Sequence, residues 1–221
     1  MTAAEVLKPP AVPAGTTPRI PAGIRLPWLH LRTRRVPAGI LALTVCGAVL
    51  QVALHWHWTF NSGPYAQQVP MIIEAGAATV IAVTAHSPFG ETERSAGHWL
   101  PYLRLFAAAG MCGLAIALLQ LGAAGESLNG GVLVLARNVI GITGIGLLCS
   151  LVTGGLLAWT LPLGYMAFCQ YALLEAWTAP WTWPVRPAAD LGAWICACAV
   201  FAAGLLLFTI LGPRTRLSDD S

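Results

Sequence analysis

The sequence predicts an all-α integral membrane protein with six transmembrane helices, an N-terminal interfacial amphipathic helix and both termini in the cytoplasm. Of its 221 residues, 57% are hydrophobic and only 10% are charged, where soluble domains carry about a quarter. The mean hydropathy is +0.69. These values exclude an ordinary soluble globule, a disordered protein and a nucleic-acid-binding protein. The formal net charge of +3 is too small to indicate a polyanionic partner.

Two segments precede the first predicted span. Residues 1–23 hold five prolines among small residues, a composition typical of a disordered tail, which we expect in the cytoplasm. Residues 24–36 mix Trp28, Leu29 and Leu31 with four arginines, which suits a short helix lying in the membrane interface. The alternative is a plain basic flank of the first span.

Residues 37–212 are predicted to form one transmembrane domain, because they contain six segments near the 20 or so apolar residues that a spanning helix needs. A short cytoplasmic tail, 213–221, follows. Little chain separates the fourth and fifth segments, so we expect a tight helical hairpin with Gly154 and Gly155 at its turn. The predicted spans are 38–56, 69–85, 99–121, 131–151, 155–174 and 191–211.

The placement of arginines predicts the orientation, because cytoplasmic loops of membrane proteins are enriched in Lys and Arg. Arginines precede the first span, lie between the second and third, and follow the sixth, whereas the opposite loops hold only Arg186. Both termini are therefore expected on the cytoplasmic side of the cell membrane. The aromatic belt at the outer interface is expected to comprise Trp56, Trp58, Trp177, Trp181 and Trp183.

Two ionisable residues stand out inside the predicted spans, where each costs about 2.5–3.5 kcal/mol on insertion scales and usually faces protein or water. Glu74 lies about 7.5 Å below the outer end of the second span, and Arg137 about 9 Å below that of the fourth. Both spans run in the same direction. We therefore predict that Glu74 and Arg137 pair or share a polar outer cavity, with Asn138 beside them. The alternative is that each side chain reaches separately to the interface.

Small residues inside the spans indicate close contacts between helices. Gly141, Gly144 and Gly146 follow the polar residues of the fourth span, and Ala109 and Gly113 form a small-xxx-small pair in the third. We expect these positions to pack helices together. A glycine-lined pathway is the alternative.

Motifs that define several enzyme classes are missing from the sequence. It has no Gly-rich loop followed by Lys-Ser or Lys-Thr, so the chain cannot itself be a P-loop ATPase. It also lacks the zincin and nucleophile-elbow motifs, so no catalytic residue is assigned. His55 and His57 diverge on a helix without an evident third ligand, and Cys196 and Cys198 lack the spacing of a zinc or redox motif. We expect no metal site.

The segment 86–98, between the second and third spans, is the most charged of the predicted cytoplasmic loops. It holds Glu91, Glu93 and Arg94, followed by Gly97. Such a segment can hold a soluble partner through salt bridges and carry motion into the membrane. The alternative is a solvated connector.

This loop and the layout around it resemble the ABC-2-type permeases, the membrane subunits of many ABC exporters. The stretch 93–97 is similar to the acidic-Arg-x-x-Gly-like stretch where the ATPase subunit docks in that family, and 24–36 is similar to its interfacial helix. The aromatic, proline-broken stretch 177–184 resembles the family's partly re-entrant segment before the last span. The resemblance covers 24–216 in layout but few residues in motif, and 86–98 is short for the family's docking helix. The chain also resembles small actinobacterial membrane proteins of permease type, rich in Ala, Gly and Leu.

The resemblance implies a permease subunit of an ABC transporter that exports an amphipathic or hydrophobic substrate. It implies as partners cytoplasmic ATP-binding subunits that carry ATP and Mg, a second permease copy or sister permease, and membrane lipid. No cofactor is expected in this chain. The ATPase-docking residues would be Glu91, Glu93 and Arg94. The residues shaping the translocation pathway at the outer gate would be Glu74, Arg137 and Asn138.

Two functions of other classes remain open. The chain could be a non-transporting membrane scaffold or accessory subunit whose loop is only a connector. It could instead be an ion or metal channel that uses Glu74 and the two histidines.

Overall fold

The computed structural model describes residues 36–56, 68–85, 100–125, 131–154, 157–175, 177 and 179–211. Within these ranges all regular structure is helical and no strand occurs. The elements are α2 (Val36–His55), α3 (Gln68–Ala85), α5 (Leu100–Gly122), α6 (Gly131–Thr153), α7 (Thr160–Leu174), the 3₁₀ helix η4 (Pro180–Val185) and α8 (Leu191–Leu211). Outside the described residues lie the two tails, nearly all of the predicted interfacial helix, and Glu91, Glu93 and Arg94.

Five of these helices are long and apolar enough to cross a membrane, namely α2, α3, α5, α6 and α8. The prediction of an all-α membrane protein is therefore confirmed. Helix α7 has only 15 residues, a rise of roughly 22 Å against a hydrocarbon core of about 30 Å. It begins at Thr160 rather than at 155, because Leu157–Trp159 form part of the turn that follows Gly154. The left-handed φ of +79° at Gly154 ends α6 near the predicted turn.

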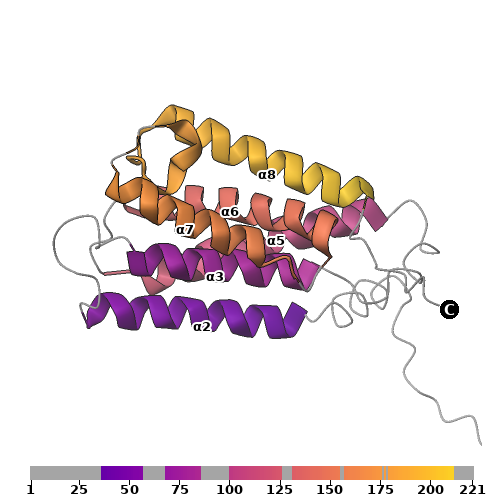
Figure 1. The fold of residues 1–221 in the computed structure, drawn as a ribbon. Helices are drawn as coiled ribbons and strands as arrows, with labels where there is room; N and C mark the ends of the chain where they lie inside the picture. The colour runs from indigo at the N-terminus through magenta and orange to yellow at the C-terminus, as the bar shows by residue number, and fades with distance from the viewer. Residues whose placement is uncertain are drawn as a thin grey trace, which may run out of the picture.

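The helices run up and down along one bundle, with α6 inside it and the others around it (Figure 1). In its most apolar stretch 67% of α6 is buried, whereas the corresponding value for α8 is 22%. Counting α7, the described chain passes along the bundle six times, so Val36 and Leu211 lie at the same end (Figure 1). We call this the terminal end, and the opposite end, where η4 lies, the η4 end.

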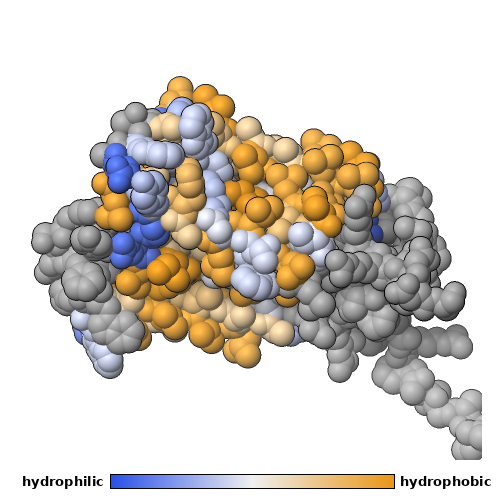
Figure 2. All heavy atoms as spheres, in the orientation of Figure 1, coloured by the Kyte–Doolittle hydropathy of each residue, from blue (hydrophilic) through white to orange (hydrophobic). Residues whose placement is uncertain are grey.

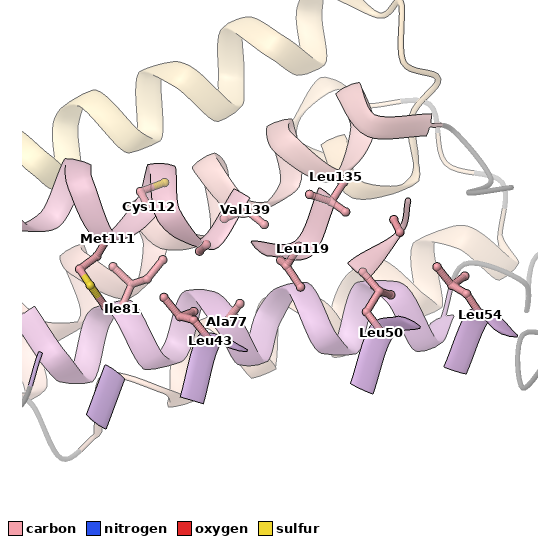
Figure 3. Close-up of a cluster of buried hydrophobic side chains, with 12 residues drawn as sticks. Leu43, Leu50, Leu54, Ala77, Ile81, Met111, Cys112, Leu119, Leu135 and Val139 are labelled. Atoms are coloured by element: carbon pink, nitrogen blue, oxygen red, sulfur yellow. The ribbon is translucent and has the colours of Figure 1, made fainter. Parts of the chain in front are cut away.

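The largest apolar cluster joins four helices. Side chains from α2, α3, α5 and α6 point toward one another and exclude solvent, with Leu50, Ile81, Leu119 and Val139 fully buried (Figure 3). Removing one such side chain from water stabilises the fold by about 1.5–3 kcal/mol in a soluble core. In lipid this gain between helices is largely absent, so close packing has to hold them together.

The exterior of the bundle is as apolar as its core. Figure 2 shows hydrophobic residues over most of the visible face and hydrophilic residues gathered at the η4 end. On α8 the exposed apolar side chains include Leu191, Ile195, Leu206, Leu207, Ile210 and Leu211. A water-soluble protein rarely exposes contiguous apolar surface on this scale, so lipid is the solvent that fits this surface.

Glycines mark the places where helices approach most closely. A Cβ atom added at Gly144 of α6 would lie 2.6 Å from Cα of Phe201 on α8, and one added at Gly204 would lie 2.6 Å from the carbonyl oxygen of Gly144. Gly47 of α2 meets α5 in the same way, at 2.8 Å from the Leu118 carbonyl oxygen. The predicted packing role of the glycines in α6 is thus confirmed. For Gly113 the predicted packing between helices of the same chain is wrong, because no atom of another described element lies within 4 Å of the added Cβ.

Replacing Gly144 by alanine should separate α6 from α8, because the new methyl group meets backbone that cannot rotate away. Overpacking of this kind costs about 1–3 kcal/mol, so we expect a lower midpoint in thermal unfolding followed by circular dichroism. The matched control is Gly113→Ala, which we expect to leave the midpoint unchanged or raised, since alanine favours a helix more than glycine does. Equal losses in both variants would contradict the close contact.

Candidate functional site

Arg137, in the second turn of α6, is completely buried and reaches toward the η4 end. This direction follows from the helix, whose side chains tilt toward its N-terminus. The guanidinium donates through Nη1 to the Pro187 carbonyl oxygen at 2.8 Å, and through Nη2 to those of Arg186, at 2.7 Å, and Trp183. One cation thus holds three main-chain carbonyls of the segment between α7 and α8.

The segment between α7 and α8 needs a hydrogen-bond donor from elsewhere, because its prolines lack backbone N–H groups. Pro180, Pro184 and Pro187 have no N–H group, so carbonyl oxygens outnumber backbone donors there. Irregular backbone at membrane depth is tolerated only where protein or water satisfies it. An arginine offers five N–H donors on a rigid plane, which makes it the side chain best able to satisfy several carbonyls at once.

Trp183 anchors the same segment to the bundle. Its ring lies over Gly141, where an added Cβ would come within 2.7 Å of it, and 4.8 Å from the Tyr165 ring, centroid to centroid. The Tyr165 hydroxyl donates to the Trp181 carbonyl oxygen at 2.6 Å. The sequence placed Trp183 in the outer aromatic belt, and this is wrong, because its side chain is 3% exposed. Trp181, two residues earlier, is exposed as expected.

Glu74 and Asn138 form the second polar contact, between α3 and α6. The Asn138 Nδ2 group donates to Glu74 Oε2 at 2.8 Å, and both side chains are buried. No ion pair joins Glu74 to Arg137 within the described residues, because the Arg137 guanidinium is directed at the carbonyl oxygens of the η4 segment. The structure therefore brings the three predicted outer-gate residues to one region, with Asn138 rather than Arg137 in contact with the carboxyl group.

Arg186 and Asp190 close the η4 segment onto α8. Arg186 Nε donates to Asp190 Oδ2 at 2.6 Å, and the Ala193 amide donates to Asp190 Oδ1 at 3.1 Å. The second bond caps the first turn of α8. The Ala193 amide, and after it the Arg186 side chain, hold the pKa of the Asp190 carboxyl below its usual range.

Sequence reasoning missed two residues that its own rules could have found. Asp190 stands directly before an apolar run, which is the signature of a helix N-cap, and Arg186 precedes it by four residues. Arg104 lies inside α5 near the terminal end and is 9% exposed. Like Arg137, it is an ionisable residue inside a predicted span.

The polar contacts hold elements of the bundle together. Arg137 is engaged by carbonyl oxygens and Glu74 by an amide, and neither faces a nucleophile. Within the described chain no three His, Cys, Asp or Glu side chains gather as a metal site would require. His57, one of the two histidines considered above, lies outside the described residues.

Comparison with known proteins finds no matching family model, no matching curated protein and no matching solved structure.

Replacing Arg137 by glutamine should release the η4 segment, because three carbonyl oxygens lose charged donors. Removing one partner of a buried charged contact costs about 3–5 kcal/mol, so we expect a large fall in the thermal midpoint and a red shift of tryptophan emission. The matched control is Arg186→Gln, which breaks only a partly exposed ion pair and should cost about 0–1 kcal/mol. Similar midpoints for both variants would rule out the clamp.

Replacing Asp190 by asparagine should lower the midpoint at neutral pH. Because the pKa of Asp190 is lowered in the folded chain, its stabilising effect exists above the ordinary value of about 4 and disappears as the pH falls through the folded value. The difference between wild type and variant should therefore close in acid. Glu175→Gln, an exposed acid at the end of α7, serves as the control. A difference that persists in acid would show that ionised Asp190 is not its source.

Proposed function

We propose that this chain is the transmembrane permease subunit of an ABC transporter, working with separate subunits that hydrolyse ATP. One observation carries the proposal furthest: α3 ends and α5 begins at the terminal end of the bundle (Figure 1). The charged segment with Glu91, Glu93 and Arg94 belongs to the connection between these two helices. This charged segment is therefore joined to the terminal end, as are the chain segments before α2 and after α8.

The orientation follows from charge. Arginines at 25, 32, 34 and 35 precede α2, Arg94 lies in the α3–α5 connection, and Arg214 and Arg216 follow α8. By the positive-inside rule, the terminal end lies on the cytoplasmic side of a cell membrane, where ATP-binding subunits would dock. On this proposal α7 is a sixth, shorter span that leads into η4, so both termini are cytoplasmic.

Contacts among the described helices support a mechanical route from the proposed docking loop to the far end of the bundle. The loop continues directly into α3 and α5, and α3 packs against α2, α5, α6 and α7. A push on the loop would move α3, whose Glu74 is bonded to Asn138 on α6. The neighbouring Arg137 holds η4. The motion would thus reach the segment that covers the η4 end, which on this proposal is the outer gate.

Several further features belong to the proposal. The chain has no P-loop, so ATP and Mg would bind to the partner subunits. A second copy or a sister permease would complete a two-fold pathway. The substrate would be amphipathic or hydrophobic and exported, since the buried charged residues of the described helices are few: Glu74, Arg104 and Arg137.

The test is a pull-down from native membranes in mild detergent, with the full-length chain tagged. We expect a soluble ATPase, identified by its sequence and its ATP hydrolysis, to copurify with wild type. The amount recovered should fall at least about tenfold with Glu93→Lys or Arg94→Glu, which corresponds to a loss of roughly 1.4 kcal/mol in binding free energy.

Matched controls make the same charge changes elsewhere in the chain: Glu5→Lys and Arg19→Glu, both in the N-terminal segment. These should retain the ATPase. If wild type recovers no ATPase, or if the loop variants recover as much as the controls, the permease proposal fails and the scaffold and channel alternatives take its place.

A further inference from the structure

Glu74 is a buried carboxyl group with little compensation from its described neighbours. Its side chain is 2% exposed, and the Asn138 amide at 2.8 Å is its hydrogen-bond donor among the described residues. An ionised carboxylate offers about four acceptor positions, so most of them would lack a donor here. Burying such a charge unpaired is among the largest penalties in a membrane interior.

The cation beside it does not remove this penalty. Arg137 directs its guanidinium at the carbonyl oxygens of the η4 segment and lies beyond ion-pair distance of Glu74. Helices α2, α5, α6 and α7 pack against α3, and Arg137 is the one permanently charged residue in the half of them nearest η4. The other ionisable side chains in that half are Cys46, His55, Cys112, Cys169 and Tyr171, and Tyr165 lies just short of the middle of α7. Arg104 of α5 lies toward the terminal end.

We propose that Glu74 is a proton-binding site, whose carboxyl group holds a proton in the folded chain and exchanges it with water at the η4 end. On release the O–H bond of the carboxyl group breaks, the proton passes to a water molecule and Glu74 keeps the negative charge. On uptake the same bond re-forms.

Asn138 suits both states of this site. With Glu74 ionised, the Asn138 Nδ2 group donates to the carboxylate, as the 2.8 Å contact allows. With Glu74 protonated, the acid becomes a donor, and the Asn138 Oδ1 atom is a buried acceptor with no partner in the described chain. An amide combines a donor and an acceptor in one group, so its presence opposite the carboxyl group fits a proton that comes and goes.

The site lies close to the η4 end of the bundle. Glu74 lies six residues after the start of α3, about 9 Å by helical rise from the η4 end. On α7, Gln170 lies next to Met71, one turn nearer that end, and its Oε1 atom is also without a partner in the described chain. Polar atoms thus continue from Glu74 toward the η4 end. The proposal does not depend on the ATPase partner and stands or falls separately from it.

The test uses the full-length chain in lipid nanodiscs and infrared difference spectroscopy. At about pH 7, where an ordinary glutamate is ionised, we expect a C=O stretching band of a protonated carboxylic acid in wild type. The band should be absent in Glu74→Gln, and Asn138→Leu should shift its frequency because a hydrogen bond is lost. Glu175→Gln, the exposed control on α7, should leave the band unchanged.

Thermal unfolding provides a second readout. If Glu74 holds a proton when folded and loses it when unfolded, folding takes up a proton, and stability falls as the pH rises toward about 9. Glu74→Gln, which mimics the protonated acid, should fold normally and lose this decline, whereas Glu175→Gln should keep it.

Either of two results would overturn the proposal. The first is a wild type without the acid band at about pH 7, or with a band that survives in Glu74→Gln. The second is a thermal midpoint of wild type that changes with Na⁺ but not with pH, together with a Glu74→Gln midpoint that changes with neither. That result would identify a metal cation, not a proton, as the group that neutralises the carboxylate.

Discussion

Helix α6 is the most deeply buried of the five long apolar helices, and its glycines are what allow this. Gly141 leaves room for the ring of Trp183, Gly144 for the backbone of α8, and Gly146 for Ala82 of α3. Each glycine therefore faces a different neighbour, and a side chain at any of them would push that neighbour away. The polar contacts depend on the same packing. Arg137 and Asn138 precede these glycines on α6, and they reach η4 and α3 only while those elements stay close.

The two polar contacts differ in what they can do. Arg137 is a permanent charge held by three carbonyl oxygens of a proline-rich segment that has few donors of its own, so this contact is a fixed clamp. Glu74 and Asn138 share one hydrogen bond and leave an amide oxygen unused, so this contact can change. Because Arg137 and Asn138 are consecutive, a shift of α3 reaches η4 through a single turn of α6. In the proposed permease, this linkage connects the docking loop to the outer gate.

Most helix boundaries were predictable because long apolar runs between polar and glycine-rich stretches define them. Residues 191–211 match α8, and 69–85 differs from α3 by one residue. The fifth span was placed five residues too early, since hydropathy cannot tell an apolar turn from an apolar helix. Trp183 was assigned to the interface for a related reason: a tryptophan near the end of a span can face lipid or protein, and only the gap at Gly141 decides.

The sequence by itself determined that the chain is a helical membrane protein and that Glu74, Arg137 and Asn138 are among its costly buried polar residues. Composition and the price of burial in lipid are properties of residues, so they need no coordinates. The tertiary structure decided which groups these residues contact. Arg137 meets carbonyl oxygens about 50 positions away in sequence, and Asn138 meets Glu74 across 64 positions. Such partners are set by which helices lie side by side. The glycine pattern shows where α6 can be approached closely, but it does not show which neighbour each glycine meets.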